Sequence, residues 1–319
     1  MVAERWMTPE LFAGSLARDE YGLCADKDEQ MHERLLRHHR EFITRQDIDR
    51  IKQAGFDMVR VPVGYWLWEK TEGHIYDPDV VGTLLDWCED ARLGVILSLH
   101  GAPGSQNGWD HSGRSGNMQW AEADNIAKSL EVIAGIGDRY GKHTALIGIG
   151  VLNEPHSDIE LDTLMDFYAK AAEIIRRHAA PSVRIIVSDS FRPTEVAKKM
   201  HDYGLEDCVL DVHLYQTFTA ADQQLTFDEH IEKVETQWRT LLARLGTYSH
   251  VMVGEWCAML AAETFAGVSD ITRRGMVKRY YDAQQKVFTQ NAWGWAYWSY
   301  KTSGSSVWNW SEHDDLRVQ

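Results

Sequence analysis

The chain has 319 residues, of which 44% are hydrophobic and 25% charged, with a formal net charge of −15 at pH 7. This is the composition of a globular protein, and the acidic excess argues against nucleic acid or an anionic membrane as partner, since both select clustered lysine and arginine. No apolar run approaches the roughly 18 to 20 residues of a membrane span. No signal peptide is visible either, so we expect a cytoplasmic protein with a neutral substrate. If the natural N-terminus lies upstream of Met1, secretion becomes possible.

The four cysteines lie far apart and form no CxxC pair: Cys24, Cys88, Cys208 and Cys257. This pattern favours reduced, mostly buried thiols in a cytoplasmic setting, with one or two disulfides as the alternative. The chain also contains 13 tryptophans, whose rings fill protein cores but also stack on the C–H faces of sugars.

The predicted elements alternate between helices and short apolar strands. Residues 35–56 have a helical pattern, and Thr44 is expected to cap the helix that follows it. Seven apolar runs come next, at 58–63, 94–101, 146–153, 183–190, 209–216, 250–256 and 293–301. Their apolar character is continuous rather than alternating, which predicts parallel strands covered on both faces. Between them, residues 79–92, 162–180 and 227–246 place apolar residues three and four apart, as amphipathic helices do.

Alternating strands and helices indicate βα units, and the closed architecture that suits them is the (β/α)8 TIM barrel. We expect one such catalytic domain over residues 1–319. Only seven strands are recognisable, whereas the barrel needs eight, and residues 1–57 contain no further run of this character. The missing first strand is therefore expected upstream of Met1. A barrel left open there would expose unpaired backbone, so we expect reduced stability.

Function in such barrels collects at the C-terminal ends of the strands. Every run except 183–190 ends in polar or aromatic groups: Arg60, His100, Asn153, Glu154, His213, Tyr215, Glu255 and Trp298. A single glutamate after a strand is usually a solvated loop residue. Two glutamates from opposite sides of a ring would face each other, and facing carboxylates are what glycoside hydrolysis requires, one protonated and one ionised.

Six segments resemble the successive motifs of glycoside hydrolase family 5, in its exo-β-1,3-glucanase branch. They are "FDMVRVPVGYW", "LHGAPGSQNGWDHSG", "GVLNEP", "LDVHLYQTF", "VGEW" and "GWAYWSYKT". The resemblance runs from "ERWMTPELF" near the start to "YWSYKT", nearly the whole chain. The Asn-Glu-Pro tripeptide alone would be weak, and the order and spacing of six motifs make the resemblance specific. Members of the family usually begin with a glycine-rich first strand, and this chain starts after it, which agrees with the strand count.

The resemblance implies a role for each matching residue. Glu154 corresponds to the family's acid/base and Glu255 to its nucleophile, in a mechanism that retains anomeric configuration, with carboxyl groups about 5 to 5.5 Å apart. The implied substrate-binding residues are Arg60, His100, Asn153, His213, Tyr215 and Trp298, with an aromatic clamp at Trp109 and Phe218. Trp109 stands where the family usually has phenylalanine. The "ERWMTPELF" segment resembles a stretch that lines the glycone pocket, which nominates Glu4 and Trp6.

We therefore expect a retaining hydrolase of β-glucosidic linkages, exo-acting on β-1,3-glucan. It should need no cofactor, and we expect a monomer whose partner is the oligo- or polysaccharide. The alternatives are an endo-acting β-glycanase on β-1,4-glucan, β-1,6-glucan or mannan, and a catalytically silent sugar-binding barrel. No metal is expected, because helical spacing does not bring His32, His38 and His39 together with acids in ligand geometry.

Overall fold

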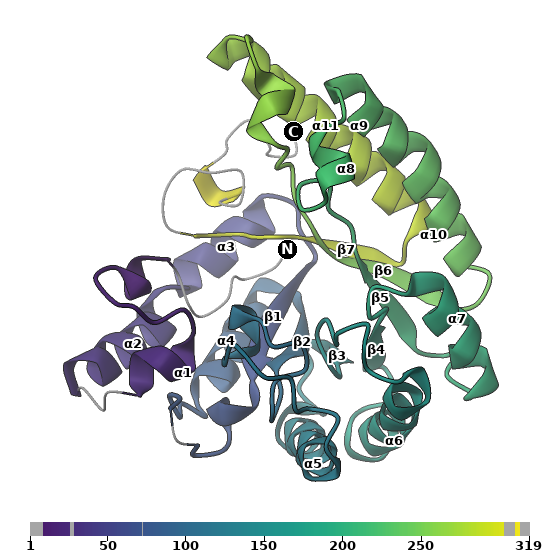
Figure 1. Cartoon of the computed structure of the whole chain (residues 1–319). Coiled ribbons are helices and arrows are strands. Elements are labelled where there is room, and N and C mark those ends of the chain that lie inside the picture. The colour runs from purple at the N-terminus through teal and green to yellow at the C-terminus, as the bar shows by residue number, and fades with distance from the viewer. Residues whose placement is uncertain (1–8, 26–28, 72, 303–309, 313–319) are drawn as a thin grey trace.

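The computed structural model describes residues 9–25, 29–71, 73–302 and 310–312. Its seven strands form one sheet in which each strand pairs in parallel with the next along the chain. They are β1 (Met58–Gly64), β2 (Gly94–Gly101), β3 (Leu146–Gly150), β4 (Arg184–Ser188), β5 (Val209–His213), β6 (His250–Trp256) and β7 (Gly294–Tyr297). The sheet curves round with the helices outside it (Figure 1). The predicted fold class, a TIM barrel in which seven strands are recognisable, is confirmed.

The strands are buried on both faces, which explains their continuous apolar sequences. Residues that point inward form a small interior cluster that includes Ile96, Ile186, Val209 and Met252. Their neighbours along each strand point outward and join the large core between sheet and helices. Because strand side chains alternate between the two faces, a strand with both faces covered shows no polar alternation.

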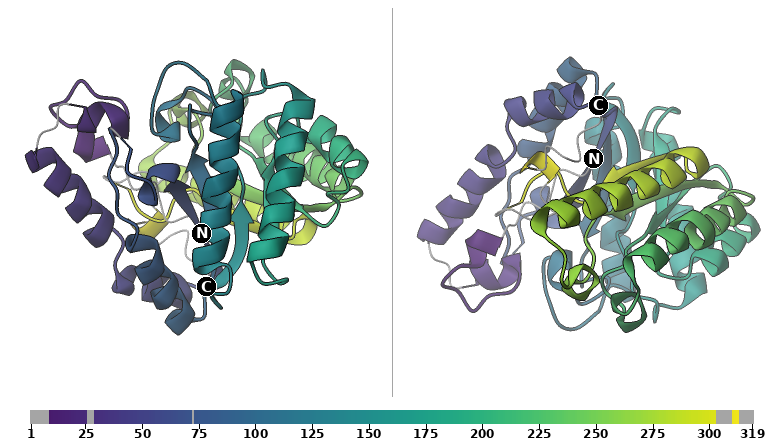
Figure 2. Two further views of the ribbon diagram at one scale, coloured as in Figure 1. Left: turned by 90° about the horizontal axis from the view of Figure 1, so that it is seen from below. Right: turned by 90° about the horizontal axis from the view of Figure 1, so that it is seen from above.

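The helices that cover the sheet follow the strands in order. They are α4 (Val80–Ala91), α5 (Ala123–Tyr140), α6 (Leu161–His178), α7 (Pro193–Asp202), α8 (Ala220–Gln223), α9 (Phe227–Lys233), α10 (Arg239–Leu245) and α11 (Asp270–Asn291). The two views of Figure 2 show the longer ones on the outside of the sheet. The helices predicted at 79–92 and 162–180 are confirmed as α4 and α6. The one predicted at 227–246 is helical throughout, with a π-helical turn at Val234–Trp238 between α9 and α10.

Among the described residues, a short 3-10 helix (Pro9–Phe12) and three α-helices precede the first strand: α1 (Glu20–Cys24), α2 (Glu29–Glu41) and α3 (Arg45–Gln53). The helical pattern predicted over residues 35–56 is divided between α2 and α3, with a new helix starting after Thr44. The reason is the cap at Thr44, which is confirmed: its backbone is extended, its hydroxyl accepts from the Asp47 amide, and its own amide donates to the Asp47 carboxylate at 2.9 Å. This reciprocal capping box starts a new helix.

The barrel has a seam between its first and last strands. Within the described residues, β1 pairs only with β2 and β7 only with β6. The prediction of seven strands is thus confirmed, while the position of an eighth strand upstream of Met1 stays a prediction. All four cysteines are free thiols, and three of them are buried. In the described ranges, no helix has both the length and the apolar character that crossing a bilayer requires.

Candidate active site

Two glutamates face each other at the C-terminal end of the barrel. Glu255 lies within β6, and Glu154 follows the end of β3. A carboxylate oxygen of each lies within 4.8 Å of the other, close to the separation of about 5 to 5.5 Å found in retaining glycosidases. Glu154 has a left-handed backbone with φ of 44°. Such a conformation costs energy for a residue with a side chain and is concentrated at functional sites.

Glu255 is held from two directions by hydrogen-bond donors. Arg60 Nη1 donates to Glu255 Oε1 at 2.9 Å, and the Tyr215 hydroxyl donates to Oε2 at 3.0 Å. The same guanidinium donates through Nη2 to Asn153 Oδ1 at 2.6 Å. Arg60, Asn153 and Glu255 are all buried. The arginine, brought up by β1, therefore fixes the orientation of Glu255 relative to the amide that precedes Glu154.

His213 lies between the two glutamates. Its Nδ1 is 2.6 Å from Glu154 Oε1 and 3.6 Å from Glu255 Oε2, and its Nε2 is 3.5 Å from Asp211 Oδ2. Asp211 Oδ2 also lies 3.6 Å from Arg60 Nη2. Asp211 was not predicted, although it stands two residues before His213 and therefore on the same face of β5. That spacing is a signal that could have identified it.

Charge and burial give the two carboxyl groups different acidities. Burial acts to raise the pKa of Glu154, but the hydrogen bond and charge of His213, with help from His111 and Arg60, outweigh it and lower this pKa to about 2. Burial raises the pKa of Glu255, and the charges of His213 and Arg60 only partly oppose the rise. Burial also disfavours a charged His213, yet Glu255 and Asp211 raise its pKa well above the usual value. In the free site, the proton between Glu154 and His213 therefore rests on the imidazole.

His100 and Trp298 stack on each other at the site, with ring centroids 5.6 Å apart and an interplanar angle of 16°. His100 Nε2 lies 3.3 Å from Asn153 Nδ2, which connects this ring pair to Arg60 and the carboxylates. The structure thus brings together the eight residues predicted from the strand ends.

The loop between β2 and α5 supports Glu154. Gln106, fully buried, donates through Nε2 to the carbonyl oxygens of His100 (2.6 Å) and Asn153 (2.9 Å), and its Oε1 accepts from the Ala102 amide. Asn107 Nδ2 donates to the Glu154 carbonyl oxygen at 3.0 Å. The glycine-rich sequence "GAPGSQNG" therefore forms a turn whose side chains Gln106 and Asn107 hydrogen-bond to the backbone of Asn153 and Glu154.

The same loop contributes a second imidazole to the site. His111 Nε2 lies 3.3 Å from Glu154 Oε2. Sequence reasoning missed His111, because the course of a long loop does not follow from its sequence.

Three aromatic rings lie exposed at the rim of the site: Trp109 is 40% exposed, Phe191 46% and Phe218 68%. Trp109 and Phe191 contact each other edge to face, and Phe218 contacts Tyr215 in the same way. Phe191 was not predicted, because the run at 183–190 was the one not expected to supply a polar or aromatic group at its end. That expectation is wrong: β4 leads into Ser190 and Phe191, which both have left-handed backbones and turn the phenylalanine ring toward Trp109. Two further predicted residues, Glu4 and Trp6, lie outside the described residues.

The donor atoms at the centre also resemble a cation site, since ligand atoms of Glu154, His213 and Glu255 all lie within 4.8 Å of one another. The guanidinium of Arg60 already places a positive charge on Glu255. A divalent ion at this point would meet that charge, so the arrangement suits proton transfer and nucleophilic attack better than metal binding.

A parallel barrel with two glutamates facing each other at its C-terminal mouth, Glu255 buried and Glu154 half-buried, is the arrangement typical of a glycoside hydrolase. Residues 26–304 match the family model described as Cellulase (glycosyl hydrolase family 5). The chain belongs to glycosyl hydrolase family 5.

Relatives with curated names agree with this assignment. The chain is similar to "Probable glucan 1,3-beta-glucosidase A" of Aspergillus niger, with 30% identity covering 97% of this chain and 82% of the relative. It is equally similar to "Glucan 1,3-beta-glucosidase 1" of Schizosaccharomyces pombe, with 30% identity covering 96% and 82%. Among solved structures, a rutinosidase from Aspergillus niger superposes with a TM-score of 0.80 at 19% identity, covering 95% of this chain and 87% of the other, which supports the fold.

Proposed function

We propose that this glycosidase acts on β-1,3-glucan from the chain end, with retention of configuration. The observation that carries the proposal is the glutamate pair within 4.8 Å, with Arg60 and Tyr215 on Glu255 and His213 on Glu154. Attack needs an oriented carboxylate, and leaving-group departure needs a proton donor on the opposite side. Glu255, held by Arg60 and Tyr215, meets the first requirement, and Glu154, beside His213, meets the second.

The mechanism follows from where the proton can move. In the free site this proton is on His213, so it first crosses the 2.6 Å hydrogen bond from His213 Nδ1 to Glu154. Glu255 then attacks the anomeric carbon while Glu154 passes the proton to the leaving oxygen, which leaves Glu154 ionised and His213 neutral. The glycosyl–enzyme ester removes the negative charge of Glu255. The ionised Glu154 then deprotonates the water that cleaves the ester and returns the proton to His213, and Glu255 leaves as carboxylate. No step calls for a metal or a cofactor. Because burial raises the pKa of Glu255, we expect activity to fall at acid pH earlier than an ordinary glutamate would allow.

Two observations support β-1,3-glucan as substrate and exo action. The curated relatives are named glucan 1,3-beta-glucosidases. The exposed rings of Trp109 and Phe218 stand at the mouth, where they can stack on a sugar that leaves the site.

One observation favours endo action as the second candidate. The alignment with the Aspergillus niger relative runs over 352 residues, whereas this chain has only 319, so the relative carries segments that have no counterpart here. If these segments are loops at the barrel mouth, their absence here leaves a more open cleft, and an open cleft admits the middle of a chain.

Replacing the nucleophile tests the proposal. We expect Glu255→Ala to lower kcat on an aryl β-glucoside by about 10⁴-fold or more, and added azide to restore turnover by taking the place of the carboxylate. Circular dichroism would establish that the variant is folded. Turnover at the wild-type rate in the folded variant would contradict the role of Glu255.

Product analysis separates exo from endo action. On laminarin, an exo-acting enzyme releases glucose from the first minutes, whereas an endo-acting one first releases a ladder of oligosaccharides. Cellulose oligomers and mannan serve as linkage controls. Faster cleavage of either control than of laminarin would overturn the assignment of β-1,3-glucan.

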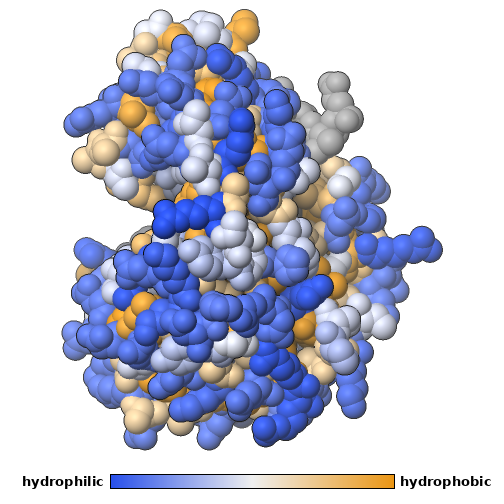
Figure 3. Space-filling model, turned by 90° about the vertical axis from the view of Figure 1, so that its right-hand side faces the viewer, coloured by the Kyte–Doolittle hydropathy of each residue, from blue (hydrophilic) through white to orange (hydrophobic). Residues whose placement is uncertain are grey.

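We also propose a monomer in a reducing compartment. The face shown in Figure 3 is largely hydrophilic, with hydrophobic residues scattered rather than gathered in one large patch. All four cysteines are free, as in proteins of reducing compartments. Light scattering coupled to size exclusion, and thiol counting on freshly isolated protein, test these two points.

A further inference from the structure

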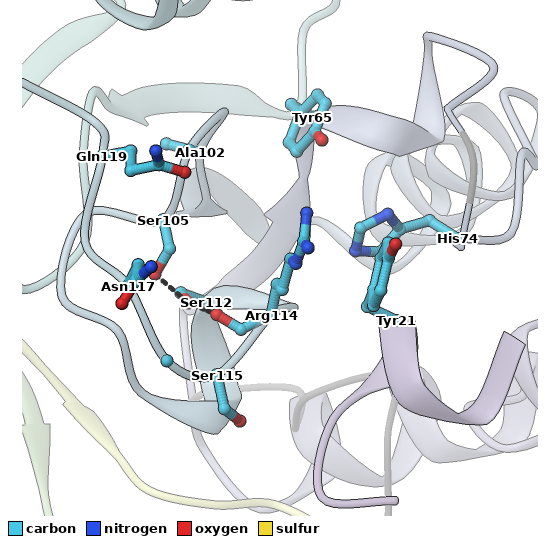
Figure 4. Close-up of a pocket in the computed structure, with 12 residues that line it drawn as sticks. Tyr21, Tyr65, His74, Ala102, Ser105, Ser112, Arg114, Ser115, Asn117 and Gln119 are labelled. Atoms are coloured by element: carbon cyan, nitrogen blue, oxygen red, sulfur yellow. Dashed lines mark hydrogen bonds between the residues drawn. The ribbon is translucent and has the colours of Figure 1, made fainter. Parts of the chain in front are cut away.

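A cavity of about 390 Å³ lies between α1, the segment after β1 and the loop between β2 and α5 (Figure 4). Three parts of the chain line it: Tyr21 from α1, Tyr65 and His74 from the segment after β1, and residues 102–119 in the loop between β2 and α5. None of the eight residues brought together at the catalytic site lines it, although it shares the loop between β2 and α5 with that site. Its volume falls at the low end of the 300 to 1,000 Å³ typical of small-molecule sites, which suits one or two sugar units.

The cavity walls are fastened together by hydrogen bonds between these segments. The Ser115 amide donates to Asp19 Oδ2 at 2.6 Å, and the Tyr21 amide donates to the Gly113 carbonyl oxygen at 3.1 Å. His74 Nε2 lies 3.2 Å from the same carbonyl oxygen. The cavity is therefore a preformed feature of the folded chain, and small ligands generally bind at preformed sites.

The chemistry of the lining matches a neutral saccharide. Tyr21 and Tyr65 supply aromatic rings, and the Arg114 guanidinium lies over the Tyr21 ring, 4.1 Å from its centroid. Ser115 Oγ is a buried atom with no hydrogen-bond partner in the described part of the chain. The lining contains no aspartate or glutamate, and its other polar side chains are His74, Ser105, Ser112, Asn117 and Gln119. Aromatic rings can stack on a pyranose, and planar donors and hydroxyls can hydrogen-bond to its hydroxyl groups.

One loop separates this cavity from the catalytic centre. Its residue His111 contacts Glu154, while the next residue, Ser112, lines the cavity. A glucan bound in the cavity would therefore lie across this loop from Glu154. Resting on the proposed function, we propose that the cavity is an accessory site that holds a glucosyl unit of the polysaccharide substrate. An anion held by Arg114 is the rival occupant.

The test compares a polymer with a substrate too small to reach both sites. Arg114→Ala removes the stacked guanidinium, and Asn117→Trp places a large ring at the cavity wall. Both positions are exposed, so both variants should fold. Lys199→Ala is the matched control, because Lys199 also lies over a tyrosine ring, 5.9 Å from the Tyr203 centroid, and lines no part of the cavity.

We expect both cavity variants to lose about three- to tenfold in kcat/KM on soluble laminarin while keeping the wild-type value on an aryl β-glucoside. Lys199→Ala should match the wild type on both. Equal loss on both substrates, or no loss on laminarin, would overturn the accessory site. Sulfate binding that depends on Arg114, with laminarin kinetics unchanged, would overturn it in favour of an anion site. Failure of the proposed function would look different, since the wild type would then not cleave the aryl β-glucoside.

Discussion

At the scale of single residues, the site works through one imidazole shared by three carboxylates. His213 touches Glu154 and Asp211 through its two ring nitrogens and lies 3.6 Å from Glu255. A ring nitrogen directed at Asp211 fixes which nitrogen faces Glu154, as an orienting carboxylate does for a general base in other enzymes. Asp211 touches neither the sugar site nor the reacting atoms, so it acts as a positioning residue.

Replacing Asp211 should shift the pH dependence of activity. The negative charge of Asp211 helps to raise the pKa of His213, so Asp211→Asn should lower that pKa and release the imidazole proton at lower pH. Because His213 supplies the proton to Glu154, the alkaline limb of kcat/KM should move to lower pH, and the maximum should fall roughly 10- to 100-fold.

Asp138→Asn is the control for this change. Asp138 also contacts a histidine, at 2.6 Å from His178 Nδ1, but the pair lies at the exposed surface. Its pH profile should equal that of the wild type. An alkaline limb that stays in place in Asp211→Asn would show that Asp211 does not act through His213.

At the scale of elements, the site residues at the strand ends could be predicted from the sequence, whereas those in the loops could not. The alternation of a strand fixes which side chains point into the barrel, so Arg60, His213 and Glu255 followed from the apolar runs alone. His111 and Phe191 were missed because they sit in turns with left-handed residues nearby, namely Ser105 and Ser190, where local sequence sets no periodic pattern. The roles within the glutamate pair came from the family resemblance rather than from periodicity.

The loop between β2 and α5 gives a prediction at this scale. Gln106→Ala removes three buried hydrogen bonds and leaves the Asn153 carbonyl oxygen without that donor. We expect a loss of about 3 kcal/mol in the free energy of unfolding, together with lower kcat, because the backbone before Glu154 loses its support. Urea unfolding and aryl β-glucoside kinetics measure both.

Gln223→Ala is the comparison for Gln106→Ala. Gln223 is exposed and donates to the Thr217 carbonyl oxygen at 3.0 Å, so its loss should change stability by no more than about 0.5 kcal/mol. Equal stabilities for the two variants would contradict the view that Gln106 stabilises the backbone before Glu154.

At the scale of the whole molecule, the barrel is a seven-stranded sheet with two edges. Strands β2 to β6 each have a neighbour on both sides, whereas β1 and β7 each have one among the described residues. The catalytic residues are divided across this arrangement: Arg60 comes from β1 and Trp298 follows β7, so the seam lies between two walls of one pocket. Counting strands in the sequence anticipated this feature, because each buried strand has a recognisable apolar run. The packing at the seam did not follow from that count.

The seam should be visible in native-state hydrogen exchange. Backbone amides of an edge strand open more easily than those of a strand paired on both sides. We expect peptides that cover Gly294–Tyr297 to exchange at least roughly tenfold faster than peptides that cover Arg184–Ser188, at a pH where the protein is fully folded. The matched comparison is β1, which should fall between them because its seven residues all pair with β2. Equal protection of β7 and β4 would mean that another segment covers the edge, and the barrel would then be closed in solution.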